Sequence, residues 1–299
     1  MNKKLEKKKK IINIFEPTFG NRIKSYFYSR LISIRPTILL VLLKRCLLVR
    51  RKYVKTSTGH IFWIDPLSEF GIIILKDRIY ELQMTRLLQL VLRSGDTFID
   101  VGGYEGYFSI IASSLISDGQ IHCIEPQSRL QEVIRENMRI NNASLVKIHK
   151  IVLSEKEGKT ELFLAPSTVA GNSSIDKHYR MWFVKEKVFA DTIDSFFKKN
   201  NLSRARLLKI DTEGSEYCII KGAYTVLSKQ AIDFIALEYH PGLLSDEEII
   251  RTHEILKNAG YILTQINRQT IYHLRGLEKE MQGLGDLRVD INLERGSYI

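Results

Sequence analysis

Residues 96–109, DTFIDVGGYEGYFS, contain a strand–turn–helix unit on which the rest of the sequence depends. The β-branched and aromatic run 97–101 is typical of a buried strand. A glycine-rich turn follows it, and the apolar residues from Tyr107 to Leu115 predict a helix. A helix start offers unpaired backbone N–H groups, and glycines let a ligand approach the backbone closely. The unit therefore predicts a ligand site.

The glycine spacing distinguishes between nucleotide cofactors. A dinucleotide-binding turn requires G-x-G-x-x-G, and Gly102 and Gly106 occupy its outer positions. Tyr104, however, stands where the middle glycine would admit a pyrophosphate, and the carboxylate of Asp100 would repel that group. The same carboxylate would suit a cofactor that carries an amino acid and a sulfonium cation. These residues favour S-adenosylmethionine (SAM).

A second acid-ended strand supports a nucleoside cofactor. Residues 121–126, IHCIEP, form a short apolar run that ends in the acid Glu125. An acid at the end of the second strand of a doubly wound fold can accept hydrogen bonds from both ribose hydroxyls of a nucleoside. We therefore predict that Glu125 holds the ribose.

Strands and helices alternate along the rest of the chain. This alternation predicts an α/β fold with a doubly wound, Rossmann-like, mostly parallel sheet and right-handed crossovers. Runs at 261–266 and 270–274 add a C-terminal antiparallel hairpin. The other expected strands are 146–152, 155–164, 206–211 and 232–239. The other expected helices are 128–141, 212–227 and 246–259.

The residues before the first core strand predict further elements. We expect a hairpin at 53–64, an extended piece at 69–75 and an amphipathic helix at 80–93. Residues 165–187 are polar and show no period, so we expect an irregular loop that selects the substrate.

The charge of the chain is unevenly distributed. The 299 residues carry a net charge of +11, but residues 1–55 hold 16 Lys/Arg and two Asp/Glu, which leaves the remainder at −3. We expect a basic, partly helical N-terminal extension (1–52), a catalytic domain (53–275) and a C-terminal tail (276–299). Enzymes that act on nucleic acid more often gather basic residues around the active face, so the distribution disfavours a nucleic-acid substrate.

Residues 37–49, TILLVLLKRCLLV, are strongly apolar but contain Lys44 and Arg45. A membrane-spanning helix needs about 20 apolar residues, so we expect no transmembrane span. Two interpretations stay open: an accessory helix packed on the catalytic domain, or a basic amphipathic segment on an anionic membrane. Three cysteines without metal-ligand spacing favour a reducing compartment. We expect a cytoplasmic protein. The alternative is a cytoplasmic protein that also contacts the membrane surface through residues 1–52.

The motifs FIDVGGYEGYFS, HCIEPQ, VFADTIDSF and above all LLKIDTEGSEYCIIKGA resemble the FkbM-type family of SAM-dependent methyltransferases. The resemblance covers about residues 55–265 and implies the class I methyltransferase fold. Carried over residue by residue, it places Asp100, Gly102 and Gly106 at the methionine part of SAM, Glu125 at the ribose, and Leu153 and Ser154 near the adenine. The chain departs from the family at two predicted cofactor-binding positions, because Gly103 usually is Ala and Tyr104 usually is Asn.

A second set of acids marks the chemistry. Asp211 ends the strand LLKID and Glu213 follows it, while His240 closes the next strand. A hydroxyl acceptor benefits from a base as its oxygen becomes nucleophilic, so we predict Asp211, Glu213 and His240 as the catalytic residues. Lys209, one strand period before Asp211, is expected to point the same way and to pair with an acid or steady the acceptor.

Two other interpretations of these acids stay open. Glu216 could instead match the dipole of a helix start. The spacing of histidines and cysteines predicts no metal, and a divalent ion at Asp211, Glu213 and Glu238 is the alternative.

The sequence thus favours a SAM-dependent O-methyltransferase that acts on a hydroxyl of a small molecule, sugar or glycolipid-like acceptor. A nucleic-acid methyltransferase and a non-catalytic binding protein with the same fold are the alternatives. The sequence predicts neither the identity of the acceptor nor the oligomeric state.

Overall fold

The computed structural model of the chain describes residues 46, 48–175, 184–240, 242–266 and 269–281. Most of the predicted basic, partly helical extension 1–52, which includes the apolar segment 37–49, lies outside these residues, as does most of the tail 276–299.

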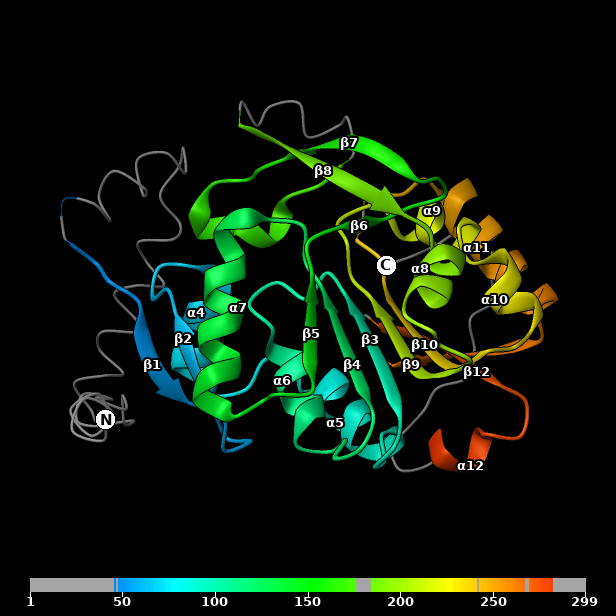
Figure 1. Cartoon of the computed structure of the whole chain (residues 1–299), viewed down its shortest axis with the longest axis horizontal. Helices are drawn as coiled ribbons and strands as arrows, with labels where there is room; N and C mark the ends of the chain where they lie inside the picture. The colour runs from blue at the N-terminus through cyan, green and yellow to red at the C-terminus, as the bar shows by residue number, and fades with distance from the viewer. Residues whose placement is uncertain (1–45, 47, 176–183, 241, 267–268, 282–299) are drawn as a thin grey trace.

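A seven-stranded sheet forms the centre of the molecule (Figure 1). Its order is β11 (Tyr261–Ile266), β12 (Gln269–Leu274), β10 (Ile232–Glu238), β9 (Ala205–Ile210), β3 (Thr97–Val101), β4 (Gln120–Ile124) and β5 (Val146–His149). The pairs from β10 to β5 are parallel, whereas β12 is antiparallel to both β10 and β11. The predicted mostly parallel sheet with a C-terminal antiparallel hairpin is therefore confirmed.

Helices cover both faces of this sheet. Side chains alternate along each strand, so Phe98 faces one apolar core and Ile99 faces the other. The first core packs against α4 (Glu69–Asp77), α5 (Leu82–Val91), α6 (Tyr107–Ser113) and α7 (Ser128–Asn141). The second packs against α8 (Ile193–Lys199), α9 (Glu216–Lys221), α10 (Tyr224–Ser228) and α11 (Asp246–Asn258). The short α12 (Glu278–Met281) adds Met281 to the first core.

Two smaller sheets complete the fold. The predicted hairpin at 53–64 is confirmed as β1 (Lys52–Lys55) and β2 (Ile61–Ile64). A three-stranded sheet in the order β6 (Val152–Leu153), β8 (Lys185–Asp191), β7 (Gly158–Phe163) lies across the carboxyl end of the main sheet (Figure 1). The predicted strand 146–152 is thus divided, because β5 belongs to the main sheet and β6 to this second sheet.

The extended piece predicted at 69–75 is wrong, because these residues form α4. The Ser68 hydroxyl caps the helix by accepting a hydrogen bond from the Gly71 N–H at 2.9 Å. Gly71 also lets the helix approach the preceding turn, since a Cβ there would lie 1.8 Å from the backbone oxygen of Asp65. The capping serine outweighs the strand propensity of the isoleucine-rich run.

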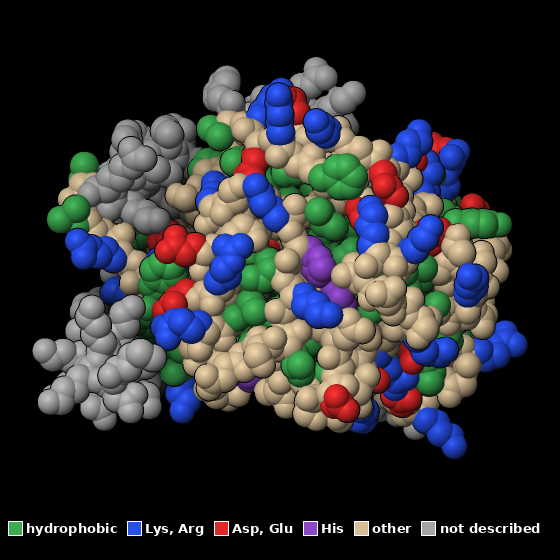
Figure 2. All heavy atoms as spheres, viewed as in Figure 1, with side chains coloured by type: hydrophobic (Ala, Val, Ile, Leu, Met, Phe, Trp, Pro, Cys, Tyr) green, Lys and Arg blue, Asp and Glu red, His purple; other side chains and the backbone are tan. Residues whose placement is uncertain are grey.

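The described surface mixes charges. Figure 2 shows Lys and Arg side chains interspersed with Asp and Glu on the face drawn. At the N-terminal edge, the Arg51 guanidinium donates to the Glu105 carboxylate at 2.9 Å and to the Trp63 carbonyl at 2.9 Å. The last residues of the predicted extension therefore pack on the main fold. Among the described residues, no helix is both long enough and apolar enough to cross a membrane.

Candidate functional site

A cavity of about 780 Å³ lies at the carboxyl ends of β3, β4, β9 and β10. This is where ligands bind in open α/β sheets, and the volume suits a cofactor site. Helices α4 and α5 supply one wall through Phe70 and Leu82. The second sheet and the 3₁₀ turn η2 (Ser167–Asn172) supply another through Leu162 and Gly171.

The segment at η2 is fastened to both ends of the cavity. The Gln127 amide and the Arg129 guanidinium, which follow β4, donate to the carbonyls of Ala170 and Ala165 at 3.1 and 2.7 Å. On the other side, the Ser174 hydroxyl donates to the Glu213 carbonyl at 2.8 Å. The wall is therefore tied to residues that follow the predicted ribose contact Glu125 and to the loop that carries Glu213.

The glycine turn after β3 packs tightly against its neighbours. Gly102 has φ +76°, and a Cβ there would lie 1.8 Å from the Asp211 carbonyl oxygen. A Cβ on Gly103 would lie 2.4 Å from the Cys123 sulfur. Both glycines line the cavity, but Gly106, at φ +82° before α6, does not.

Tyr104, the departure from the family pattern, lines the cavity without closing it. Its backbone has φ +49°, and its ring packs edge-on to Phe70 with centroids 5.8 Å apart. Burial and the neighbouring Glu105 raise the pKa of the Tyr104 hydroxyl well above its usual value, so it stays neutral. The side chain therefore acts as an aromatic wall.

Glu125 is placed to hold a ribose. Its two oxygens accept hydrogen bonds from the backbone N–H groups of Tyr104 and Gln127, each at 3.0 Å. A carboxylate has about four acceptor positions, so each oxygen retains capacity for one hydroxyl. Burial raises the pKa of Glu125 to about 7. The carboxyl lines the cavity and is 3% exposed.

The apolar end of the cavity contains one of the two residues predicted for the adenine. Leu153 lines it, together with Ile124 and Leu162. Ser154 does not, because it lies under α9 and α10: its N–H donates to the Asp191 carbonyl at 2.8 Å, and its carbonyl oxygen is 2.2 Å from where a Cβ of Gly222 would be.

Asp100 is also absent from the cavity wall. The register pairs Asp100 with Lys209, and Asp211 lies two residues beyond Lys209, just after the end of β9. Asp100 is thus one strand period short of Asp211, and it does not line the cavity. It is fully buried, and its Oδ2 accepts hydrogen bonds from the Ser109 hydroxyl at 2.7 Å and the Ser109 N–H at 3.2 Å. The structure places it beneath the glycine turn, and direct contact with the methionine part stays a prediction.

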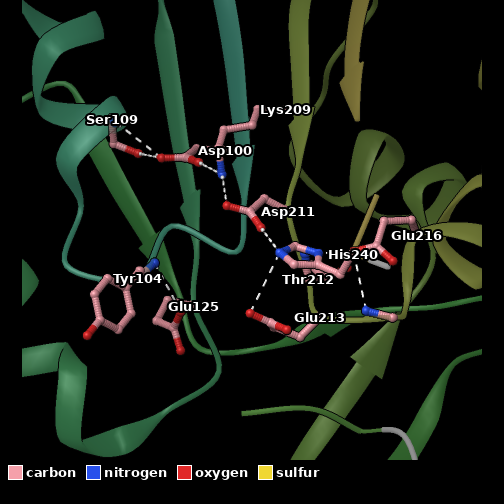
Figure 3. A network of polar contacts seen from close by, with 11 residues as sticks. Asp100, Tyr104, Ser109, Glu125, Lys209, Asp211, Thr212, Glu213, Glu216 and His240 are labelled. Atoms are coloured by element: carbon pink, nitrogen blue, oxygen red, sulfur yellow. Dashed lines mark hydrogen bonds and ion pairs between the residues drawn. The ribbon is translucent and has the colours of Figure 1, made fainter. Parts of the chain in front are cut away.

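The three predicted catalytic residues come together on the opposite wall (Figure 3). His240 Nε2 lies 3.6 Å from Asp211 Oδ1 and 3.7 Å from Glu213 Oε1. Burial by itself lowers the pKa of His240, but Glu216, Glu213 and Asp211 together raise it to about 9. At neutral pH, His240 is therefore an imidazolium and has no free lone pair with which to accept a proton.

Glu216 holds the loop that carries Asp211 and Glu213. It is fully buried, and its Oε1 accepts hydrogen bonds from the Thr212 N–H at 2.9 Å and the Thr212 hydroxyl at 3.2 Å. The same oxygen is 3.9 Å from His240 Nδ1. Its position as the first residue of α9 agrees with the interpretation as a helix-start acid.

Sequence reasoning missed Glu81, which precedes α5 and lines the same wall. Oxygens of Glu81, Asp211 and Glu238 lie within 4.8 Å of one another. Burial, Asp211 and Glu238 raise the pKa of Glu81 to about 8, so it is mostly protonated at neutral pH. Its sequence position, inside a predicted amphipathic helix, gave no signal of this contact.

The site residues fit SAM. A carboxyl with capacity for two ribose hydroxyls, a glycine turn that no Cβ could fill, and an apolar end beside Leu153 lie along one cavity. Gly102, Gly103 and Tyr104 would hold the amino-acid part, and Glu125 the ribose.

Comparison with known proteins identifies the family. The model of the FkbM methyltransferase domain matches residues 100–263. A curated relative, Methyltransferase 1 of Beauveria bassiana (strain ARSEF 2860), is 28% identical over a match that covers 42% of this chain and 58% of that protein. The chain thus spans little more than half the length of that relative.

Solved structures resemble the chain weakly. Precorrin-6y C5,15-methyltransferase from Geobacter metallireducens has a TM-score of 0.39 and 16% identity, with 64% of this chain and 86% of that chain covered. A TehB-like SAM-dependent methyltransferase from Corynebacterium glutamicum has a TM-score of 0.38 and 9% identity, with 68% and 92% covered. Likenesses of this strength carry no argument about the site. The family match covers more than half of the chain, and the chain belongs to the FkbM family of SAM-dependent methyltransferases.

Proposed function

We propose that the protein is an O-methyltransferase that transfers the methyl group of SAM to a hydroxyl of a small molecule, sugar or glycolipid-like acceptor. One observation carries the proposal: a single cavity joins the cofactor residues Gly102 and Glu125 to the acids Asp211 and Glu213. Gly102 and Glu125 would hold SAM, and Asp211 and Glu213 would lie beside the acceptor hydroxyl in the same cavity.

Each residue on the wall around Asp211 has a separate role in the proposed methyl transfer. SAM supplies a methyl group already activated on a sulfonium, so positioning of the acceptor is the main requirement. As the acceptor oxygen bonds to the methyl carbon and the carbon–sulfur bond breaks, the hydroxyl proton passes to Asp211, which lines the cavity. His240 as an imidazolium and Lys209 as an ammonium flank Asp211 and stabilise the negative charge that develops beside it. Glu81, largely protonated, can donate a hydrogen bond to the acceptor.

The assignment of His240 changes with this geometry. The sequence predicts it as a candidate base, but its raised pKa of about 9 makes it a cation at working pH. We therefore assign proton transfer to Asp211 and charge stabilisation to His240.

Labelled methyl transfer tests the proposal. Purified protein is incubated with methyl-labelled SAM and a panel of hydroxyl, amine and nucleic-acid acceptors, and the product bond is identified by mass spectrometry. We expect transfer to a hydroxyl, with kcat reduced about 100-fold or more by Asp211→Asn, because a general base contributes about 10²–10⁴-fold. Asp118→Asn, an exposed turn residue, is the matched control and should leave kcat unchanged.

Transfer to nitrogen or to nucleic acid alone would contradict the proposal. Tight SAM binding with no transfer to any acceptor would favour the non-catalytic alternative.

A further inference from the structure

Lys209 provides a buried ammonium at the floor of the cavity. Its side chain is 4% exposed, and its Nζ lies 3.2 Å from Asp211 Oδ2 and 3.5 Å from Asp100 Oδ1. Burial alone would lower the pKa of Lys209, but the carboxylates, Asp211 first and then Asp100, more than reverse this and raise it above its usual value. Lys209 is therefore a permanent cation over the whole working range of pH.

The sheet register fixes where this cation lies. Asp100 on β3 is directly opposite Lys209 on β9, and Asp211 follows on the same face of the sheet. The ring of Phe108 covers the ammonium, with its centroid 5.3 Å from Nζ. Asp100, Asp211 and Phe108 thus hold the ammonium, and Lys209 also lines the cavity.

Hydrogen bonds from Ser109 hold the Asp100 carboxylate in place. Both the hydroxyl and the N–H of Ser109 donate to its Oδ2, which leaves Oδ1 facing Lys209. A continuous polar chain therefore runs from Ser109 through Asp100, Lys209 and Asp211 to His240 (Figure 3). Lys209 bonds one oxygen of Asp211, Oδ2, while the other, Oδ1, faces His240.

We propose that Lys209 is a positioning residue that fixes the orientation of the Asp211 carboxylate toward the methyl acceptor, with Asp100 as its anchor. This inference rests on the proposed role of Asp211 as the proton acceptor. It gives Asp100, which does not line the cavity, a role in the transfer step. It also explains why a charged side chain stands in the interior of a core strand.

A mutant cycle tests the inference. Lys209→Met removes the charge while keeping a long side chain, and Lys209→Arg retains the charge. We expect Lys209→Met to bind SAM as the wild type does but to lose about 100-fold in kcat, the size of a misplaced catalytic group. Lys209→Arg should restore most of this loss. Lys147→Met, an exposed lysine of β5, is the matched control and should change neither.

The decisive measurement is the effect of Lys209→Met in a protein that already carries Asp211→Asn. If Lys209 acts through Asp211, the two losses are strongly non-additive, and Lys209→Met has little further effect there. An equal loss in both backgrounds would overturn the inference, as would a loss of SAM affinity that accounts for the fall in activity. If Lys209→Met does not fold, Asp100→Asn keeps the shape and the Ser109 bonds while it weakens the anchor; an unchanged kcat in that variant would overturn the inference.

One readout needs no activity, so a failure here differs from a failure of the proposed function. The groups facing His240 are Asp211, Glu213 and Glu216. In Lys209→Met, the imidazole no longer shares Asp211 with a second cation, so its NMR titration should move to higher pH. An unmoved titration in the folded variant would refute the coupling, whereas wild-type protein that methylates no acceptor would refute only the proposed function.

Discussion

Glu125 and His240 occupy opposite walls of one cavity, and their pKa values rise for opposite reasons. Burial raises that of Glu125 to about 7, which favours its neutral form. Burial lowers that of His240, but three neighbouring carboxylates raise it to about 9, which favours its charged form. Near neutral pH, the wall that contains Glu125 thus carries a carboxyl that is about half ionised. The wall that contains His240 carries a cation.

Cofactor affinity should follow the ionisation of Glu125. Because ribose hydroxyls donate to the ionised carboxylate, the affinity for 5′-methylthioadenosine, which lacks a titrating amino-acid group, should rise up to about tenfold between pH 6 and pH 8. Calorimetry across this range measures the effect. Glu125→Gln should bind more weakly and without this dependence. A flat profile in the wild type would contradict the role of Glu125.

The raised pKa of Glu125 also determines how its contribution to folding stability changes with pH. The folded-state pKa of Glu125, about 7, is above the ordinary value of 4.5, so its contribution to the stability of the ligand-free fold is complete below pH 4.5. That contribution is lost as the pH rises through 7. Ligand binding reverses this loss, because the hydroxyls stabilise the ionised form.

At the scale of elements, the turn after β3 is matched to the strand beside it. The family resemblance gives Ala at the position of Gly103, and here that methyl group would lie 2.4 Å from the sulfur of Cys123. The sulfur of this fully buried cysteine on β4 thus occupies space that an alanine would need. The glycine and the cysteine therefore fit each other in this packing.

Gly103→Ala should therefore destabilise the fold by about 1–3 kcal/mol, the usual cost of overpacking a core. Cys123→Ala in the same chain should recover most of this loss, since it removes the clashing sulfur. Urea unfolding followed by circular dichroism measures both variants. Equal stability of Gly103→Ala and wild type would show that the turn accommodates the methyl group without a clash with the Cys123 sulfur.

The core elements could be predicted from sequence because their signals are local. Acid-ended apolar runs gave β3, β4, β9 and β10, and with them the positions of Glu125 and Asp211. The offset of Asp100 depends on how β3 pairs with β9, and the approach of Glu81 depends on how α5 packs. Strand pairing and helix packing join segments that are distant in the sequence. Local strand and helix patterns do not reveal which segments will meet. The same holds for the division of 146–152 between two sheets.

At the scale of the whole molecule, charge is segregated along the chain. Residues 1–55 carry a net +14 and the remainder −3. Of the basic residues near this boundary, Arg51 is committed to Glu105. We propose that residues 1–52 contact an anionic membrane surface.

The full chain should sediment with phosphatidylserine vesicles at low salt and be released at about 0.5 M salt, where screening shortens the range of charge attraction to about 4–5 Å. Replacement of the six lysines among residues 3–10 by glutamine should weaken the binding, because each basic residue contributes about 1 kcal/mol near such a surface. Neutral phosphatidylcholine vesicles are the control. Absence of sedimentation at low salt would remove the proposal.

The wall formed by β7 and η2 comes from the stretch of chain between β6 and β9, whereas the glycine turn and the acids lie at the ends of strands of the main sheet. Gln127 and Arg129 connect the two parts by donating to backbone carbonyls of this stretch, which every residue type supplies. The stretch can thus change side chains other than Ser174, which donates to the Glu213 carbonyl, and keep these attachments. In evolutionary terms, we propose that exchange of this one stretch would offer the same reaction centre to new acceptors.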